Sequence, residues 1–206
     1  MSVAKIKQAF SLIEISIVVL IVGILIAGVT QGNRLVTEFK LKTARSLTNS
    51  SPVSGIGDLV SWYESTSEAS FESGVEDGDQ ISTWYDIAPT TNKNDATQST
   101  SGYQATYSDN GLNGLPTVLF DGSDDRFDLP DGTIPYGDSP YSIFIVARST
   151  DLDNDYAGLL RAGNMTNSDD ANQALLIRYT PSGISVVWWF TSNGLSTSAV
   201  NDNEFY

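Results

Sequence analysis

Hydrophobic and polar residues are distributed very differently in the first fifty residues and in the rest of the chain. Between Leu12 and Val29, only Glu14 and Ser16 are strongly polar or hydroxylated. These eighteen residues, at about 1.5 Å each, form a helix roughly 27 Å long, close to the hydrocarbon thickness of a bilayer. The pattern predicts a membrane-spanning helix with one carboxylate near its start. Because a charge within a bilayer is costly, we expect Glu14 to have a partner.

After the apolar run the pattern becomes amphipathic but keeps helical spacing. One stripe of the helix holds Val36, Phe39, Thr43 and Leu47, and charged residues occupy the neighbouring positions. We therefore expect one continuous helix over residues 10–47. Residues 48–57 contain Ser, Pro and Gly and are predicted to be a linker.

From residue 58 onward, short apolar runs alternate with turn residues such as Asp-Gly and Asn-Gly pairs. Ser142–Ala147 is apolar through most of its length, which predicts a central strand covered on both faces. The expected fold class is α+β, with the long helix followed by a mainly antiparallel β-sandwich of jelly-roll type over residues 58–206. The predicted strands are 59–63, 81–85, 117–120, 142–147, 158–161, 174–179 and 184–191.

Charge and composition exclude several classes of function. Residues 1–47 carry six Lys or Arg and two Glu, a net charge of +4, and the remainder carries five basic and twenty-three acidic residues, a net charge of −18. Such an acidic domain repels nucleic acid, so we expect no nucleic-acid partner. The chain has no Cys and no His, which excludes disulfides, His-based triads and ordinary zinc sites.

The residues before the apolar run indicate its orientation. Lys5 and Lys7 precede it, and positive charge at this place keeps the amino terminus on the cytoplasmic side. A secretory signal peptide is the alternative interpretation, but its apolar core has roughly 7 to 15 residues and is followed by a small-residue cleavage site. Here the run is longer, and Ala27-Gly28-Val29 is a poor cleavage site.

The sequence Lys7-Gln8-Ala9-Phe10-Ser11-Leu12-Ile13-Glu14 resembles the class III signal of type IV pilins and type II secretion pseudopilins. The resemblance implies that residues 1–9 are a leader, that a prepilin peptidase cleaves between Ala9 and Phe10, and that Phe10 is then N-methylated. The family usually has Gly before the cut, so Ala9 implies slower processing. In the family, the residue matched by Glu14 meets the amino terminus of a neighbouring subunit during filament assembly.

A second resemblance covers roughly residues 58–190. Leu59-Val-Ser-Trp62-Tyr63, Ile81-Ser-Thr-Trp84-Tyr85-Asp86, Asn94-Asp-Ala-Thr-Gln98 and Pro116-Thr-Val-Leu-Phe120-Asp121 are similar, in this order, to the opening of concanavalin A-like and laminin G-like domains. Such domains are commonly longer, so we expect the sandwich to be incomplete at its carboxyl end. The resemblance implies a glycan ligand, for which Trp188 or Trp189 is the candidate stacking residue. Trp62 and Trp84 could also stack on sugars, and the alternative for all four tryptophans is packing in the core and rim of the sandwich.

The chemistry of the acidic residues leaves two alternatives. Asp121, Asp124, Asp125 and Asp128 are candidate ligands for calcium, a hard cation that takes oxygen ligands, but solvated surface carboxylates explain them better. Asp151, Asp153 and Asp155 have the spacing of a calcium loop but lack its Gly and its bidentate Glu, so no EF-hand is expected. The chain also lacks the Glu-x-Asp-x-x-Glu motif of lectin-fold glycosidases, and we expect no enzymatic activity.

The sequence therefore predicts a prepilin-like subunit of a type IV pilus or of a type II secretion pseudopilus. We expect it first in the bacterial inner membrane, with its acidic domain in the periplasm, and then in a filament. Its expected partners are membrane lipid, prepilin peptidase and other pilin or pseudopilin subunits. The alternative is a lectin-like binding module, an adhesin that the same helix anchors and that recognises glycans.

Overall fold

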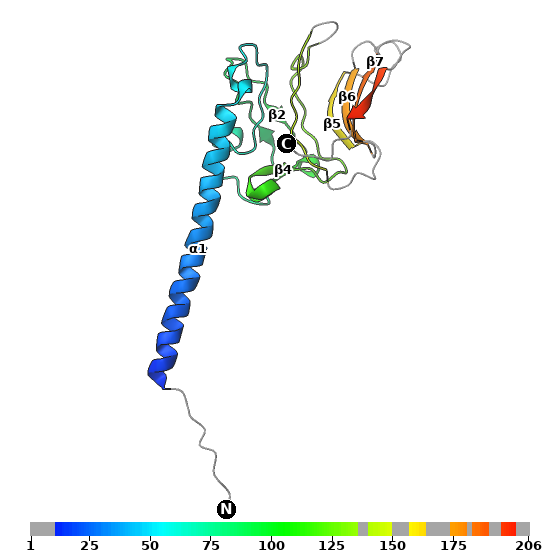
Figure 1. The fold of residues 1–206 in the computed structure, drawn as a ribbon. Coiled ribbons are helices and arrows are strands. Elements are labelled where there is room, and N and C mark those ends of the chain that lie inside the picture. The colour runs from blue at the N-terminus through cyan, green and yellow to red at the C-terminus, as the bar shows by residue number, and fades with distance from the viewer. Residues whose placement is uncertain are drawn as a thin grey trace, which may run out of the picture. The chain divides into compact units, whose positions relative to one another are not determined.

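The computed structural model describes residues 11–135, 140–149, 157–163, 174–180, 183–189 and 195–200 (Figure 1). The chain divides into two compact units, residues 1–120 and residues 121–206. The predicted leader and its cleavage site, Ala9 and Phe10, lie outside the described residues, as do the three acids of the excluded EF-hand.

The first unit begins with the helix α1, Leu12–Asn49, which confirms the long apolar helix that the sequence predicts (Figure 1). Ser11 is its N-cap residue, and Ser50 follows its last turn. Pro52 then opens a short 3₁₀ helix, Pro52–Gly55, so the chain turns away where a proline cannot continue the α-helix. The amino-terminal part of α1 is long and apolar enough to cross a membrane.

The outer half of α1 presents two different faces. Leu41, Ala44, Arg45 and Thr48 are partly covered, and their spacing of three and four residues places them on one side of the helix. The apolar stripe that the sequence shows lies elsewhere: Val36 is 56%, Phe39 71% and Leu47 66% exposed. The amphipathic pattern is therefore present, but the described residues do not cover its apolar stripe.

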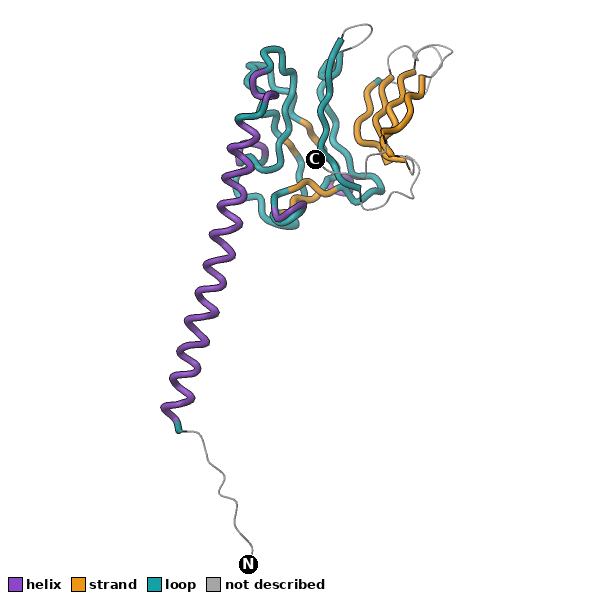
Figure 2. Tube along the Cα trace, viewed as in Figure 1, coloured by secondary structure: helices purple, strands orange, loops and turns teal. Residues whose placement is uncertain are grey.

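The rest of the first unit is mainly loop, with two small antiparallel sheets (Figure 2). β1 (Thr83–Trp84) pairs with β2 (Ala96–Thr97), and β3 (Thr106–Ser108) pairs with β4 (Thr117–Leu119). Short 3₁₀ helices lie at Glu68–Ser70, Ser101–Tyr103 and Leu112–Gly114. A bridge between Gln80 and Thr106 links the segment before β1 to β3.

An aromatic cluster forms part of the core of this unit. The ring of Trp84 lies 5.8 Å from that of Tyr63 and 5.9 Å from that of Phe71. Phe71 also meets Tyr107 edge to face, with their centroids 5.3 Å apart. Aromatic pairs at these separations add roughly 0.5–1.5 kcal/mol each beyond burial of their area. Trp84, which is half-buried, therefore packs against two aromatic side chains of this unit.

The second unit contains a four-stranded antiparallel sheet. β5 (Ala157–Ala162), β6 (Ala174–Thr180), β7 (Gly183–Trp189) and β8 (Leu195–Val200) follow one another in the chain and in the sheet. Such a meander is the simplest antiparallel connection, because each strand pairs with its neighbour in sequence. The antiparallel strands predicted at residues 158–161, 174–179 and 184–191 are confirmed in position.

Two predicted strands are wrong. Residues 59–63 are extended but do not join a sheet. Side chains of Asp86 and Asn94 bond the Trp62 amide and the Val60 carbonyl, and the Trp62 carbonyl accepts the N–H of Ile87. Residues 142–147 also form no described strand, and they are not covered on both faces: Phe144 is 69% and Val146 96% exposed. A run of apolar residues fixes neither the pairing partner nor the cover of a strand, because both come from distant parts of the chain.

Candidate functional site

The first candidate site is the beginning of α1. The Ser11 backbone N–H donates a hydrogen bond of 2.8 Å to Oε2 of Glu14, so the carboxylate caps its own helix. Acidic groups at this end of a helix are stabilised because the first N–H groups lack intrahelical partners. The second carboxylate oxygen, Oε1, has no hydrogen-bond partner among the described residues. One oxygen of Glu14 is thus not used by the part of the chain that the structure describes.

The other polar side chains along this part of the helix are satisfied within it. The Ser16 hydroxyl donates to the carbonyl of Ile13 at 2.9 Å, and the Thr30 hydroxyl donates to the carbonyl of Ile26 at 2.9 Å. The aliphatic side chains around them are exposed on every side of the helix, and a Cβ added at Gly23 or Gly28 would meet nothing. Between Leu12 and Val29, Glu14 is therefore the one ionisable side chain on a helix whose apolar side chains are all exposed.

The second feature is an ionic contact that joins the helix to the remainder of the first unit. Nε of Arg45 donates to the backbone carbonyl of Thr66 at 2.6 Å, and its Nη1 lies 2.8 Å from Oε1 of Glu68. The Thr66 amide and hydroxyl in turn donate to Oε1 of Glu64 at 2.9 and 2.7 Å. Because Glu68 is largely exposed, the bond to the Thr66 carbonyl carries most of the stabilisation that Arg45 provides.

The third feature is a buried carboxylate, Asp86, which is 3% exposed. Its Oδ1 accepts the backbone N–H groups of Trp62 and Ala88, each at 2.8 Å, and its Oδ2 accepts that of Asn94 at 3.1 Å. The Asp86 amide itself donates to Oδ1 of Asp95 at 2.9 Å. One carboxylate therefore connects three loops, and all of its described partners are backbone N–H groups.

Hydrogen bonds around Asp86 bring together the segments on which the second resemblance depends. The Asn94 side chain donates to the carbonyl of Val60 at 2.9 Å, and the hydroxyl of Tyr63 donates to the carbonyl of Asn94. Burial, and next the charge of Asp86, raises the pKa of Tyr63 well above its usual value. Sequence reasoning placed Asp86 in a motif but missed its role. The one signal was its position directly after a short strand.

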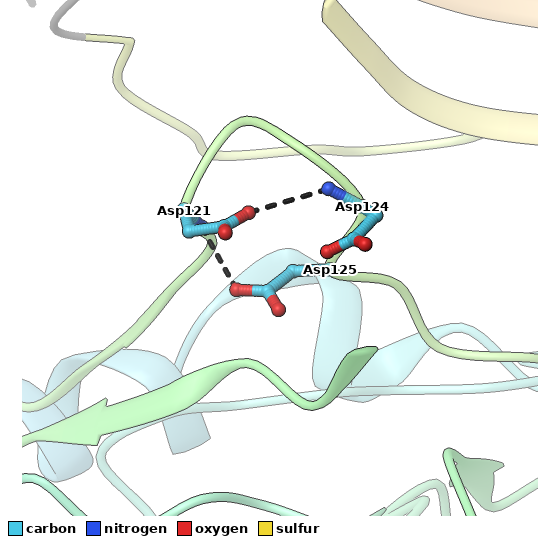
Figure 3. Close-up of side chains that lie close together, drawn as sticks. All are labelled: Asp121, Asp124 and Asp125. Atoms are coloured by element: carbon cyan, nitrogen blue, oxygen red, sulfur yellow. Dashed lines mark hydrogen bonds between the residues drawn. The ribbon is translucent and has the colours of Figure 1, made fainter. Parts of the chain in front are cut away.

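Three of the four candidate calcium ligands lie close together in the second unit. Carboxylate oxygens of Asp121, Asp124 and Asp125 lie within 4.8 Å of one another (Figure 3), whereas Asp128 is not part of this group. Asp121 Oδ1 accepts the N–H groups of Ser123 at 2.8 Å and of Asp124 at 3.4 Å, and the Asp121 N–H donates to Asp125 Oδ2 at 2.8 Å. These bonds stabilise the turn, and the amide of Ser123 above all lowers the pKa of Asp121. Turn formation explains the cluster without a cation.

The candidate glycan-stacking residues lie at the end of β7. In the antiparallel register, Trp188 is opposite Leu175, and Trp189 is opposite Ala174. Their side chains lie outside what the structure describes, so their stacking role stays a prediction.

Comparison of the chain with protein-family models, with curated proteins and with solved structures finds no match. The function must therefore be argued from the residues themselves.

Proposed function

We propose that this chain is a prepilin-like subunit that a prepilin peptidase processes between Ala9 and Phe10. The processed chain is held in the bacterial inner membrane by α1 and is then assembled through α1 into a type IV pilus or a type II secretion pseudopilus. The observation that supports this most strongly is the single carboxylate of Glu14 in the first turn of an otherwise uncovered apolar helix. Capping of the helix uses one oxygen of that carboxylate, and assembly would use the other.

Cleavage after Ala9 would create a positive amine on Phe10, four residues before Glu14. The same amine on a neighbouring copy is a suitable partner for the Glu14 oxygen that has none among the described residues. Two opposite charges 4 Å apart attract by about 4 kcal/mol at an effective dielectric constant of 20, which offsets part of their desolvation. Such a pair would also fix the axial register between helices, as a buried polar residue does in coiled coils.

The outer half of α1 supports assembly through the same helix. Phe39 lies ten residues beyond Val29, or about 15 Å along the axis, so a bilayer that covers Leu12–Val29 does not reach it. Phe39 nevertheless remains exposed, together with Val36 and Leu47. Helices of neighbouring subunits would cover this stripe in a filament, where lipid cannot.

Replacement of Glu14 tests the proposal. Glu14→Ala should leave membrane insertion unchanged, because it removes a charge from an apolar segment, and should greatly reduce the amount of filament. Glu38→Ala is the matched control: it removes an exposed acid from the same helix, where Glu38 pairs with Arg34 at 3.0 Å. Normal filament yield from Glu14→Ala would contradict the proposed role of this residue.

A second candidate function is a lectin-like adhesin that the same helix anchors. It is favoured by the hydrogen bonds through Asp86, Asn94 and Tyr63, which join segments that resemble the opening of a laminin G-like domain. In this proposal the antiparallel sheets belong to a β-sandwich that presents Trp188 or Trp189 to a glycan. Glycan-array binding by the detergent-solubilised full chain, lost in Trp188→Ala or Trp189→Ala, is the expected result. Failure to bind any glycan would leave only the structural subunit.

A further inference from the structure

Asn-Gly pairs are chemically reactive as well as turn-forming, and the chain has them at residues 110–111, 113–114 and 193–194. The backbone nitrogen of the glycine can attack the amide carbon of the asparagine side chain, because glycine has no Cβ to block the approach. The last pair lies outside the described residues. The other two lie close together in the first unit, and both asparagines are exposed. The structure holds the two attacking nitrogens differently.

The nitrogen of Gly111 is held in place. Its N–H donates a hydrogen bond of 3.0 Å to the carbonyl of Leu115. The residue is also closely packed, because a Cβ added to it would lie 1.8 Å from Oγ1 of Thr117. Attack on the side chain of Asn110 therefore requires this hydrogen bond to open and the packing to loosen.

The nitrogen of Gly114 is held less firmly. Gly114 ends the short 3₁₀ helix Leu112–Gly114, which Asn113 interrupts with φ 57° and ψ 22°. The N–H of the next residue, Leu115, closes this turn with a bond of 3.1 Å to the carbonyl of Leu112, and no described residue beyond the turn accepts the N–H of Gly114. Attack requires rotation about the Cα–C bond of Asn113. Gly114, with φ 76°, is a permissive neighbour for that rotation.

A cation lies beside the same nitrogen. Nζ of Lys40, in the outer half of α1, is 3.7 Å from the position that a Cβ on Gly114 would take. Because a Cβ lies about 2.5 Å from the nitrogen of its own residue, the ammonium is at most about 6 Å from the Gly114 nitrogen. The other atom within 4 Å of that position, Oδ1 of Asn110 at 3.5 Å, is uncharged. The ammonium therefore stabilises the negative charge that the nitrogen carries when its proton leaves before attack.

We propose that Asn113 is a modification site at which the chain deamidates itself, and that Lys40 promotes the reaction. Solvent removes the proton of the Gly114 N–H, and the nitrogen forms a bond to Cγ of Asn113. The bond from Cγ to Nδ2 breaks and ammonia leaves, with the proton that it needs supplied by water. Water then opens the resulting succinimide ring at either of its carbonyls, which gives aspartate or isoaspartate at this position.

The modification changes the charge of the first unit. It replaces a neutral amide by a carboxylate, so the net charge of the chain changes from −14 to −15. The new carboxylate belongs to the turn beside Lys40, at a contact between α1 and the rest of the first unit. The inference concerns the chemistry of this turn and does not depend on the proposed assembly function.

Ageing of the full chain, solubilised in detergent at mildly alkaline pH, tests the site. Each deamidation raises the mass of a peptide by about 1 Da, because OH replaces NH₂, and fragmentation of the peptide assigns the change to Asn110 or Asn113. Deamidation at Asn113 should be roughly tenfold faster than at Asn110, the factor that corresponds to the opening of one hydrogen bond. Equal rates at the two residues, or a faster rate at Asn110, would overturn the assignment of the site.

Substitution of Lys40 tests its part in the reaction. Lys40→Gln should slow deamidation at Asn113 about threefold, which is the effect of one charge at about 6 Å in water. Lys40→Arg should keep the wild-type rate, which separates the effect of the charge from that of the packing. Lys42→Gln is the matched control, since it removes another exposed charge from the same helix, and it should leave the rate unchanged. An unchanged rate in Lys40→Gln, or an equal reduction in Lys42→Gln, would contradict the role of Lys40.

Discussion

The buried carboxylate of Asp86 allows a quantitative prediction about the stability of the first unit. Asp86→Ala leaves the amides of Trp62, Ala88 and Asn94 without their acceptor. Hydrogen bonds to charged groups contribute about 1.5–3 kcal/mol each, and they are not additive when they share one acceptor group. We therefore expect Asp86→Ala to lower the free energy of unfolding of the first unit by about 3–5 kcal/mol.

Asp86→Asn is the finer perturbation. It keeps one oxygen, which suffices for the two N–H groups that Oδ1 accepts, but it places an NH₂ group against the amide of Asn94. The variant loses one hydrogen bond and brings two donors face to face. This should lower the free energy of unfolding by about 2 kcal/mol, less than in the alanine variant. Stability should therefore increase in the order Asp86→Ala, Asp86→Asn, wild type. This order tests the hydrogen-bond geometry and not simply the loss of charge.

The assay is amide hydrogen exchange of residues 81–98 in the full chain, because it reports local stability without requiring the two units to unfold together. The matched control is Asp109→Ala, which removes an exposed acid from the same unit and should change stability by less than about 0.5 kcal/mol. Equal protection of residues 81–98 in Asp86→Ala and Asp109→Ala would refute the reasoning.

Three further predictions concern packing, the contact between α1 and the rest of the first unit, and the pH dependence of stability. Gly111→Ala should destabilise the β3–β4 sheet by about 1–3 kcal/mol, because the new Cβ would lie 2.8 Å from Cγ2 of Thr117. Thermal melts measure this effect. The control Gly102→Ala, whose new Cβ would have no atom within 4 Å, should melt as wild type does. Arg45→Gln should increase cleavage by protease after residue 48 several-fold, because it removes the bond of 2.6 Å to the Thr66 carbonyl; equal cleavage rates would contradict this. In ultraviolet absorbance, Tyr63 should titrate at a pH above its usual pKa. Its contribution to stability is therefore complete below the unfolded pKa of about 10 and is lost as pH rises above that value. Tyr63→Phe should abolish this part of the pH dependence of stability.

The sequence was sufficient for the part of the fold that depends on local spacing. The apolar run from Leu12 and the amphipathic stretch after it determine α1, because a helix satisfies its backbone within itself. The ends of the helix differ from the prediction by two residues, since Ser11 caps the beginning and Pro52 acts only after the last turn has closed.

The remainder of the fold depends on residues that are distant in sequence. Nothing in Leu59–Tyr63 indicates that the Asp86 carboxylate, 24 residues after Trp62, would replace a neighbouring strand as the partner of its backbone. The same limitation applies to residues 142–147, where composition indicated a covered central strand and the structure has an exposed extended segment. In the candidate sites, the resemblance indicated Glu14. The sequence could not show that Asp121, Asp124 and Asp125 cluster in a hydrogen-bonded turn, which the structure shows.

The central claim is that this chain is a processed pilin-like subunit, and the amino terminus of the mature protein tests it most directly. Mass spectrometry of the chain produced with and without a prepilin peptidase would compare the two amino termini. The account predicts a chain that begins at N-methylated Phe10 when the peptidase is present and an unprocessed chain when it is absent. An unprocessed Met1 in both samples would contradict the account.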